Sequence, residues 1–417
     1  MTSHIKIIIT FNSIVLIKLL LLLLISLPSN VVIGSHDDNV PAIDPNGYIL
    51  YCSCMGRFGN QAEQLLGSLQ FAKSIDRTLI LPPFIQYSHY KVNFIPFDDY
   101  IDIKSIGHYH RVITLEKFMK VLAPIVWPED TRKIMCYSSR GSQEKACNPM
   151  DGNPFNAFWT HFGINWLTNQ SIYHSPLLTD FNFADEWKSK YNDIKVLAFV
   201  GAPSAFPTNK KATKLQQYIN FSQKVINIAD AYRENRSFAR KPYLAIHVRH
   251  GTDWIKACEL LKANPDLPQL FSSQQCSPKS SSNPLPYELC YPSIGTIVDQ
   301  IFRVTSESQI DIVYVATDNN NETLWQLIHD MIPNITLITP TKTLWSTGYI
   351  TDHKPPNDII IDVYLLSYAN HLIANCISSF SAFATRFRSH VLYLRHLTEF
   401  FAEQTLDDDL HLLRDEL

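Results

Sequence analysis

A strand–turn–helix unit near the start of the chain restricts the possible fold more than any other stretch. Residues 48–52 (Tyr-Ile-Leu-Tyr-Cys) are typical of a buried strand, and between Gln61 and Ile75 the apolar residues recur at helical spacing. A second apolar run, at residues 78–81, follows directly and ends at two prolines. Strand, helix and strand at this spacing predict a parallel α/β sheet.

The turn inside this unit, residues 55–61 (Met-Gly-Arg-Phe-Gly-Asn-Gln), is the first candidate ligand site. Gly56 and Gly59 would let the backbone approach a ligand, and the helix start offers N–H groups to an anion. Arg57 and Asn60 add a charge and an amide at the same place. The alternative is an ordinary strand–helix connection, because the pattern is neither a dinucleotide fingerprint nor a P-loop.

The rest of the chain repeats this alternation and predicts two α/β halves. Further strands are expected at residues 196–200, 243–248, 311–316, 335–338 and 371–374, and helices at 216–239, 252–262, 291–306, 322–331 and 359–369. Residues 84–160 are expected to form loops and short helices, and residues 339–357 a loop. Since ligands bind beyond the carboxyl ends of parallel strands, the two halves predict a cleft between them.

Arg249 is the strongest candidate at this cleft, because it directly follows the apolar strand 243–248. A guanidinium matches two phosphate oxygens. The competing interpretation is a salt bridge to Asp253, and the two are compatible, since a carboxylate can orient the guanidinium. His247 is more often a satisfied core histidine than a ligand, although in a nucleotide site it could contact base or ribose.

A third turn, with Ser378, Ser379 and Ser381, follows the strand at 371–374. Its hydroxyls and N–H groups would suit a diphosphate, although helix capping by serine is the commoner role. Asp362 could accept hydrogen bonds from a guanine edge or could be a solvated helix carboxylate. The acidic pairs and runs at 98–99 and 407–409 do not follow a strand, so no metal-held diphosphate is predicted. No G-x-S-x-G turn of a serine hydrolase occurs either.

The two ends of the chain predict the endoplasmic reticulum (ER) lumen. Residues 1–34 resemble a cleaved signal peptide, with Lys6 before an apolar segment and small residues near Gly34. A membrane anchor is the alternative, but the uninterrupted apolar run is shorter than the roughly 20 residues of a spanning helix. Residues 414–417 (Arg-Asp-Glu-Leu) differ at one position from the lysine-headed ER-retrieval signal.

Composition agrees with a globular protein of an oxidising compartment. The 46% hydrophobic content predicts a packed core, and a net charge of −3 gives no reason to expect nucleic-acid binding. The eight cysteines suit disulfides, although the sequence leaves many pairings open. Cys52 and Cys54 could be a metal or redox pair, but without a second pair at zinc spacing a structural disulfide is favoured.

Several motifs, taken in order, resemble the GDP-fucose protein O-fucosyltransferase family. They cover nearly the whole chain after the signal peptide, and together they are specific where each alone would be weak. The motifs are G-R-F-G-N-Q at 56–61, D-G-N-P-F at 151–155, G-A-P at 201–203, H-V-R-H-G-T-D-W at 247–254, V-Y-V-A-T-D at 313–318, N-C-I-S-S-F-S-A-F at 375–383 and the terminal R-D-E-L.

The resemblance implies a GT-B fold, with two Rossmann-like domains facing an inter-domain cleft. The expected division is a signal peptide at 1–34, an N-terminal acceptor-side domain at 35–240, a C-terminal GDP-fucose-side domain at 241–413 and a retrieval signal at 414–417. The implied activity is an inverting, metal-independent transfer of fucose from GDP-fucose. The implied acceptor is a Ser or Thr hydroxyl of a folded epidermal-growth-factor-like (EGF-like) repeat, in proteins such as Notch receptors.

The resemblance also assigns residue roles. Arg249 stands at the family's essential arginine, and we expect Asn60 to position the acceptor hydroxyl or a phosphate oxygen. The implied GDP-fucose positions are Arg57, Phe58, Gly59, Asn60, His247, Val248, Arg249, Asp362, Ser378, Ser379 and Phe380. The implied disulfides are Cys52–Cys54, Cys136–Cys147, Cys258–Cys290 and Cys276–Cys376.

Two other functions remain open at this point. The chain could be an ER chaperone that binds EGF-like repeats without catalysis, or the related fucosyltransferase that acts on thrombospondin repeats. His250 and the long segment 339–357 depart from the family's usual pattern. These departures put the binding of the acceptor protein in question more than the transfer reaction itself. No carboxylate base emerges, which favours a dissociative displacement.

Overall fold

The computed structural model describes residues 41–88, 91–137, 147–166, 171–174, 183–264, 266, 270–275, 285–319, 322–339, 342–345, 348–351 and 358–402. The predicted signal peptide, the predicted retrieval signal and Cys276 lie outside the described residues. The described residues from Ala42 onward belong to one compact unit. Among the described residues, no helix is long and apolar enough to cross a membrane.

The first half of this unit is built on a parallel sheet in the order β5-β2-β1-β8-β6-β7, with a separate β3–β4 hairpin. Its elements are β1 (Tyr48–Tyr51), α2 (Phe58–Ser74), β2 (Thr78–Leu81), β3 (Phe84–Ser88), β4 (Lys91–Ile95), α3 (Phe97–Tyr100), α4 (Ile103–Gly107), β5 (Val112–Thr114), α5 (Leu115–Lys117), the π-helix η1 (Phe118–Leu122), α6 (Ala123–Val126), η2 (Glu129–Thr131), β6 (Ile134–Tyr137), α7 (Phe155–His161), β7 (Ser171–His174), α8 (Ala184–Lys190), β8 (Val196–Phe199), α9 (Lys210–Thr213), η5 (Lys214–Tyr218) and α10 (Gln223–Asn235).

The second half has a sheet in the order β13-β12-β11-β10-β9-β14-β15, in which only β12 is antiparallel to its neighbours, β11 and β13. Its elements are β9 (Leu244–Val248), α11 (Thr252–Ala263), η6 (Ser273–Gln275), α12 (Tyr287–Cys290), α13 (Ile294–Ser308), β10 (Ile312–Thr317), α14 (Glu322–Met331), β11 (Thr336–Ile338), β12 (Lys342–Trp345), β13 (Gly348–Thr351), α15 (Asp358–Tyr368), β14 (His371–Ala374), α16 (Ser379–His390), η7 (Arg395–Leu397) and β15 (Thr398–Phe400).

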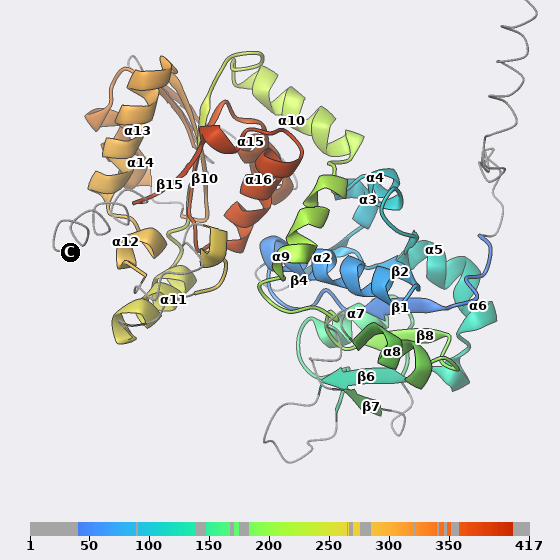
Figure 1. The fold of residues 1–417 in the computed structure, drawn as a ribbon. Helices are drawn as coiled ribbons and strands as arrows, with labels where there is room; N and C mark the ends of the chain where they lie inside the picture. The colour runs from blue at the N-terminus through green and yellow to red at the C-terminus, as the bar shows by residue number, and fades with distance from the viewer. Residues whose placement is uncertain are drawn as a thin grey trace, which may run out of the picture. The chain divides into compact units, whose positions relative to one another are not determined.

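Both sheets are covered by helices on their two faces, as the alternation of buried side chains requires. In β1, Ile49 and Tyr51 pack in the cluster that includes α2, whereas Tyr48 and Leu50 pack in a second cluster on the other face. In the second sheet, α13 and α14 cover one face, and α15 and α16 cover the other (Figure 1). The predicted α/β class with two parallel-sheet halves is confirmed.

In each sheet the strand order reverses at one strand, which determines where a ligand can bind. From β1 the chain first adds β2 and β5 on one side, and it then crosses to the other side, where it forms β6, β7 and finally β8, which lies next to β1. It moves likewise from β9 to β10 and β11, and then to β14 and β15. The turns after β1 and β9 therefore lie at the two switch points, where open α/β sheets hold their ligands.

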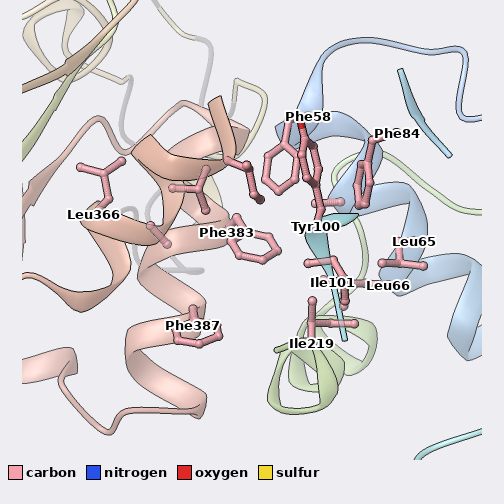
Figure 2. Packing of buried hydrophobic residues seen from close by; sticks show 14 of the residues in the cluster. Phe58, Leu65, Leu66, Phe84, Tyr100, Ile101, Ile219, Leu366, Phe383 and Phe387 are labelled. Carbon is pink, nitrogen blue, oxygen red and sulfur yellow. The ribbon is translucent and has the colours of Figure 1, made fainter. Parts of the chain in front are cut away.

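The two halves share a hydrophobic core. Helix α2 packs against α16, and α10 packs against α15. Phe58 and Tyr100 of the first half lie in the same cluster as Leu366, Phe383 and Phe387 of the second (Figure 2). Because the core is continuous, the expected division into residues 35–240 and 241–413 stays a prediction.

Three sequence expectations about elements were wrong. Residues 84–160 contain the strands β3, β4, β5 and β6 as well as short helices, and residues 339–357 contain the antiparallel pair β12 and β13. Four of these strands, β5, β6, β12 and β13, have only three or four residues, too few for a period-two pattern to stand out. The expected helix 216–239 is interrupted before Ser222, whose side chain accepts a hydrogen bond from Val225 N–H and begins α10 there.

Three of the four implied disulfides are present among the described residues. They are Cys52–Cys54, Cys136–Cys147 and Cys258–Cys290. The implied Cys276–Cys376 bridge lies outside the described residues, because Cys276 does.

Candidate active site

A cavity of about 740 Å³ receives residues from both switch-point turns. This volume falls within the range of small-molecule sites. Its lining residues are Gly56, Arg57, Phe58, Gly59, Asn60, Gln86, Tyr87, Phe206, His247, Arg249, Asp253, Trp254, Ala257, Phe271, Thr317, Asp318, Ile359, Asp362, Ile377, Ser378, Ser379 and Phe380. The sequence-predicted site residues thus meet at one cavity, with two exceptions. The Val248 side chain is fully buried in the core of the second half, and Ser381 is fully buried behind the cavity wall, 2.6 Å from His247 Nδ1.

The first wall of the cavity is the start of α2. Gly56 has a φ of +80°, and a Cβ there would lie 2.1 Å from Asn60 Nδ2, so only glycine suits this turn. Gly59 lines the cavity as expected, and it is also needed for a second reason. A Cβ at Gly59 would lie 2.6 Å from the backbone nitrogen of Phe380, so this glycine permits close approach of the second half of the chain.

Asn60 is held by a residue of that second half. Ser379 Oγ donates a hydrogen bond to Asn60 Oδ1 at 2.7 Å. Nearby, Glu63 of α2 pairs with Arg386 of α16 at 2.5 Å, and the Glu63 side chain is only 1% exposed. These polar contacts join the first turns of α2 to the start and the middle of α16, and Asn60 remains at the cavity surface.

Arg249 is held by two carboxylates at the end of β9. Its Nη2 lies 2.7 Å from Asp253 Oδ2, which confirms the predicted partner, and its Nη1 contacts Asp318. The guanidinium also lies over the Trp254 ring, 5.3 Å from the centroid. Burial lowers the pKa of Arg249, and the charge of Arg57 adds to that lowering, whereas Asp253 opposes it. Two guanidinium groups near one cavity favour an anionic ligand.

His247 is both satisfied in the core and part of the cavity wall. Its side chain is buried, and Nδ1 lies 2.6 Å from Ser381 Oγ. Burial, followed by the charge of Arg249, lowers the pKa of His247 to about 3. The imidazole is therefore neutral at physiological pH.

This pKa predicts a specific acid sensitivity. Below pH ~6.5, the ordinary histidine pKa, the unfolded chain binds a proton at His247 that the native state does not, so stability falls as pH decreases. At about 1.4 kcal/mol per pH unit, the loss from His247 between pH 6.5 and 5 is about 2 kcal/mol. His247→Gln should lose that much less stability over this interval in urea unfolding. Equal pH dependence of the two proteins would contradict a neutral His247.

The turn after β14 serves as both helix cap and cavity wall. Ser378 accepts a hydrogen bond from the backbone N–H of Phe380, so the capping interpretation is correct for this serine. Ser379 and Phe380 nevertheless line the cavity, and the Phe380 ring lies 4.9 Å from that of His247. The first N–H groups of α16 therefore lie at the cavity, where they favour an anion.

Asp362 of α15 is buried rather than solvated, so the solvated alternative was wrong. It is 7% exposed, and its Oδ1 accepts a hydrogen bond from Tyr314 Oη at 2.5 Å. Since Asp362 also lines the cavity, it offers a fixed acceptor to N–H donors of a ligand.

Several lining residues were not predicted from the sequence. Asp318 is the most consequential, because it contacts Arg249, and its place directly after a strong strand was a usable signal. The aromatic residues Tyr87, Phe206 and Phe271 come from segments without clear periodicity, which offered no such signal. Among the described residues, no group of three His, Cys, Asp or Glu side chains is arranged to hold a metal ion, and metal independence stays a prediction.

Known proteins resemble this chain over most of its length. A family model described as GDP-fucose protein O-fucosyltransferase matches residues 48–391. GDP-fucose protein O-fucosyltransferase 1 of Caenorhabditis elegans is 32% identical over 358 residues, which cover 83% of this chain and 88% of the relative. The crystal structure of POFUT1 in complex with GDP-fucose matches with a TM-score of 0.76 and 30% identity, covering 87% of this chain and 99% of that chain. The apo form matches with a TM-score of 0.75 and 31% identity over 87% of this chain and 99% of that chain.

Proposed function

This chain belongs to the GDP-fucose protein O-fucosyltransferase family, and on that premise we propose the acceptor, the stereochemistry and the compartment of its reaction. Membership makes it a fucosyltransferase whose donor is GDP-fucose. We propose that it transfers fucose, with inversion and without a metal ion, to a Ser or Thr hydroxyl of a folded EGF-like repeat. The observation that carries the donor site is the convergence of Arg57, Arg249 and the start of α16 on one cavity.

The residues around the cavity suit the parts of a nucleotide sugar. The guanidinium groups of Arg57 and Arg249 and the N–H groups of α16 offer positive potential to the diphosphate. Asp362 offers a carboxylate to the N–H donors of guanine, and neutral His247 offers its ring to base or ribose. Asn60, held by Ser379, offers its amide group to the acceptor hydroxyl or a phosphate oxygen.

The proposed mechanism is a displacement at the anomeric carbon of fucose. The bond from this carbon to the β-phosphate oxygen breaks, and the acceptor oxygen forms a bond to the opposite face of the carbon. The electron pair of the broken bond leaves with GDP, and the hydroxyl proton is released. Arg249 stabilises the charge that grows on the β-phosphate, and such stabilisation is larger in the transition state than in the ground state.

Carboxylates at the cavity are poor candidates for a general base. Burial raises the pKa of Asp253, but the charge of Arg249, its hydrogen bond and the charge of Arg57 together lower the pKa below its ordinary value, so Asp253 is a weak base at neutral pH. Asp318 is paired with the same guanidinium. This supports a dissociative reaction in which the departure of the diphosphate, rather than deprotonation of the acceptor, supplies the driving force.

The acceptor and compartment rest on sequence. EGF-like repeats with a C-x-x-x-x-(S/T)-C motif, in proteins such as Notch receptors, are the proposed partners. The ER lumen is the proposed location, supported by the candidate signal peptide at 1–34 and the ending at 414–417. Deletion of residues 414–417 should move the protein into the culture medium, and retention of the truncated protein would contradict a retrieval role.

The direct test incubates the purified protein with GDP-fucose and one folded EGF-like repeat. Mass spectrometry should show a gain of one fucose, and Ser/Thr→Ala in the acceptor motif should abolish it. A folded thrombospondin repeat should gain none, and preference for that repeat would assign the related enzyme. The mass gain should persist in excess chelator if no metal ion takes part.

A chaperone without a donor site is the second candidate function, and nucleotide binding distinguishes the two. Because a ligand that binds only the native state stabilises it, GDP at 100 times its Kd should add about 2.7 kcal/mol to the unfolding free energy. The enzyme should therefore melt at a higher temperature with GDP, whereas a pure repeat-binding chaperone should not respond.

A further inference from the structure

Asp318 and Arg249 are placed side by side by the register of two neighbouring strands. Strand β10 pairs with β9 so that Thr317 lies opposite Val248. The next residue of each strand is therefore Asp318 on one side and Arg249 on the other, at the carboxyl edge of the sheet. Asp318 thus lies beside Arg249, the arginine at the switch point, although the two residues are more than 60 positions apart in the sequence.

The two oxygens of Asp318 contact different parts of the Arg249 turn. Oδ2 contacts Nη1 of Arg249. Oδ1 accepts hydrogen bonds from the backbone N–H groups of His250 at 2.9 Å and Gly251 at 3.0 Å. One carboxylate thus holds both the guanidinium and the backbone that carries it, and the Asp318 side chain is only 21% exposed.

Gly251 provides the space for this approach. A Cβ at Gly251 would lie 2.1 Å from Asp318 Oδ2, closer than any real contact. The absence of a side chain at this position lets the carboxylate reach the turn and the guanidinium together.

Asp253 is the weaker of the two partners. Its side chain is 59% exposed and lies four residues from Arg249 in sequence, whereas Asp318 belongs to a different strand. Solvent-exposed ion pairs contribute little, since water and salt screen them and both side chains remain mobile. Asp318 therefore has the better geometry for restricting the guanidinium.

We propose that Asp318 is the positioning residue of Arg249. It presets the guanidinium at the place where charge develops on the leaving diphosphate, so that no reorganisation is needed during the reaction. It acts through Arg249 and not as a base, because its carboxylate is engaged by that cation. The inference rests on the proposed function and adds to it a residue that controls rate.

The test compares amide substitutions of matched carboxylates. Asp318→Asn keeps one oxygen for the two backbone N–H groups but can place an NH₂ group against the guanidinium. We expect kcat to fall by about 10- to 100-fold, as for other small misplacements of a catalytic group, with the KM for GDP-fucose changed less than about 3-fold. Asp253→Asn should lower kcat by less. Asp185→Asn, on the exposed surface of α8, should leave kcat unchanged.

A double-mutant cycle separates positioning from general structural damage. Lysine at position 249 keeps the charge but lacks the planar fork that Asp318 holds. We therefore expect the Arg249→Lys/Asp318→Asn double variant to transfer fucose less than about 3-fold more slowly than Arg249→Lys alone. Long incubations make these low rates measurable.

Three outcomes would overturn the inference while the wild type remains active. The first is an equal fold loss of rate from Asp318→Asn in the wild-type and Arg249→Lys backgrounds, and the second is an unchanged kcat of Asp318→Asn. The third is tighter binding of GDP-fucose by Asp318→Asn without a loss of rate. That result would show only that the substitution had removed a charge that repels the ligand. Failure of the wild type to transfer fucose or to bind GDP would instead reject the proposed function.

Discussion

Arg249→Ala should lower kcat for fucose transfer by on the order of 100-fold or more, the loss typical for removal of a preorganised donor in a water-excluded site. The guanidinium is the group that faces the leaving diphosphate, and its side chain is 15% exposed. Its two carboxylate partners would remain in the variant and repel the phosphate, which adds to the loss. Initial rates with saturating GDP-fucose and a folded EGF-like repeat measure the effect.

Two controls accompany this experiment. Arg249→Lys keeps the charge and should recover only part of the rate, because an ammonium group cannot make the bidentate contact of a guanidinium with phosphate oxygens. Arg303→Ala, which breaks a pair with Glu399 away from the cavity-lining residues, should leave kcat unchanged. Transfer by Arg249→Ala at near wild-type rate would reject the mechanism.

Gly59→Ala should be nearly as damaging, although it adds only a methyl group. The new Cβ would lie 2.6 Å from Ser379 Oγ and from the backbone nitrogen of Phe380. The backbone nitrogen of Phe380 cannot rotate aside as a side chain can. The start of α2 must therefore move away from residues 378–380, the turn that begins α16. We expect kcat/KM to fall by about 100-fold, the effect of a misplacement of about 1 Å at a reacting site.

The same substitution should cost stability. Overpacking of a closely packed contact typically costs about 1–3 kcal/mol, so the melting temperature should fall. Gly107→Ala is the matched control, because a Cβ there would meet nothing within 4 Å. The control should keep full activity and the wild-type melting temperature or a slightly higher one. Full activity of Gly59→Ala would show that the contact between α2 and the 378–380 turn is not required.

The candidate site was partly predictable, for local reasons. Arg249 directly follows an apolar strand and Arg57 lies in the turn after another, and the carboxyl end of a parallel strand is where ligands bind. Asp253 was predictable as a partner because it lies one helical turn from Arg249. Asp318 was not, because its role depends on the pairing of β9 with β10.

Residues with two possible roles needed the structure to decide between them. Ser378 caps α16 and also lines the cavity, and His247 is a satisfied core residue that also faces the ligand space. Asp362 could have been solvated, but it is buried against Tyr314. Burial depends on what packs from elsewhere, so the periodicity of a single helix could not distinguish these cases.

By itself, the sequence determined the α/β class, most of the longer elements and the turns that carry the arginines. These properties depend on side chains a few residues apart, whose spacing follows from the geometry of helices and strands. The tertiary structure alone decided which turns meet. Ser379 and Asn60 are 319 residues apart, and their hydrogen bond exists because α2 and α16 pack in one shared core. A contact of that separation leaves no local pattern, so the pairing of Asp318 with Arg249 and the contact of Gly59 with the 378–380 turn emerged only with the fold.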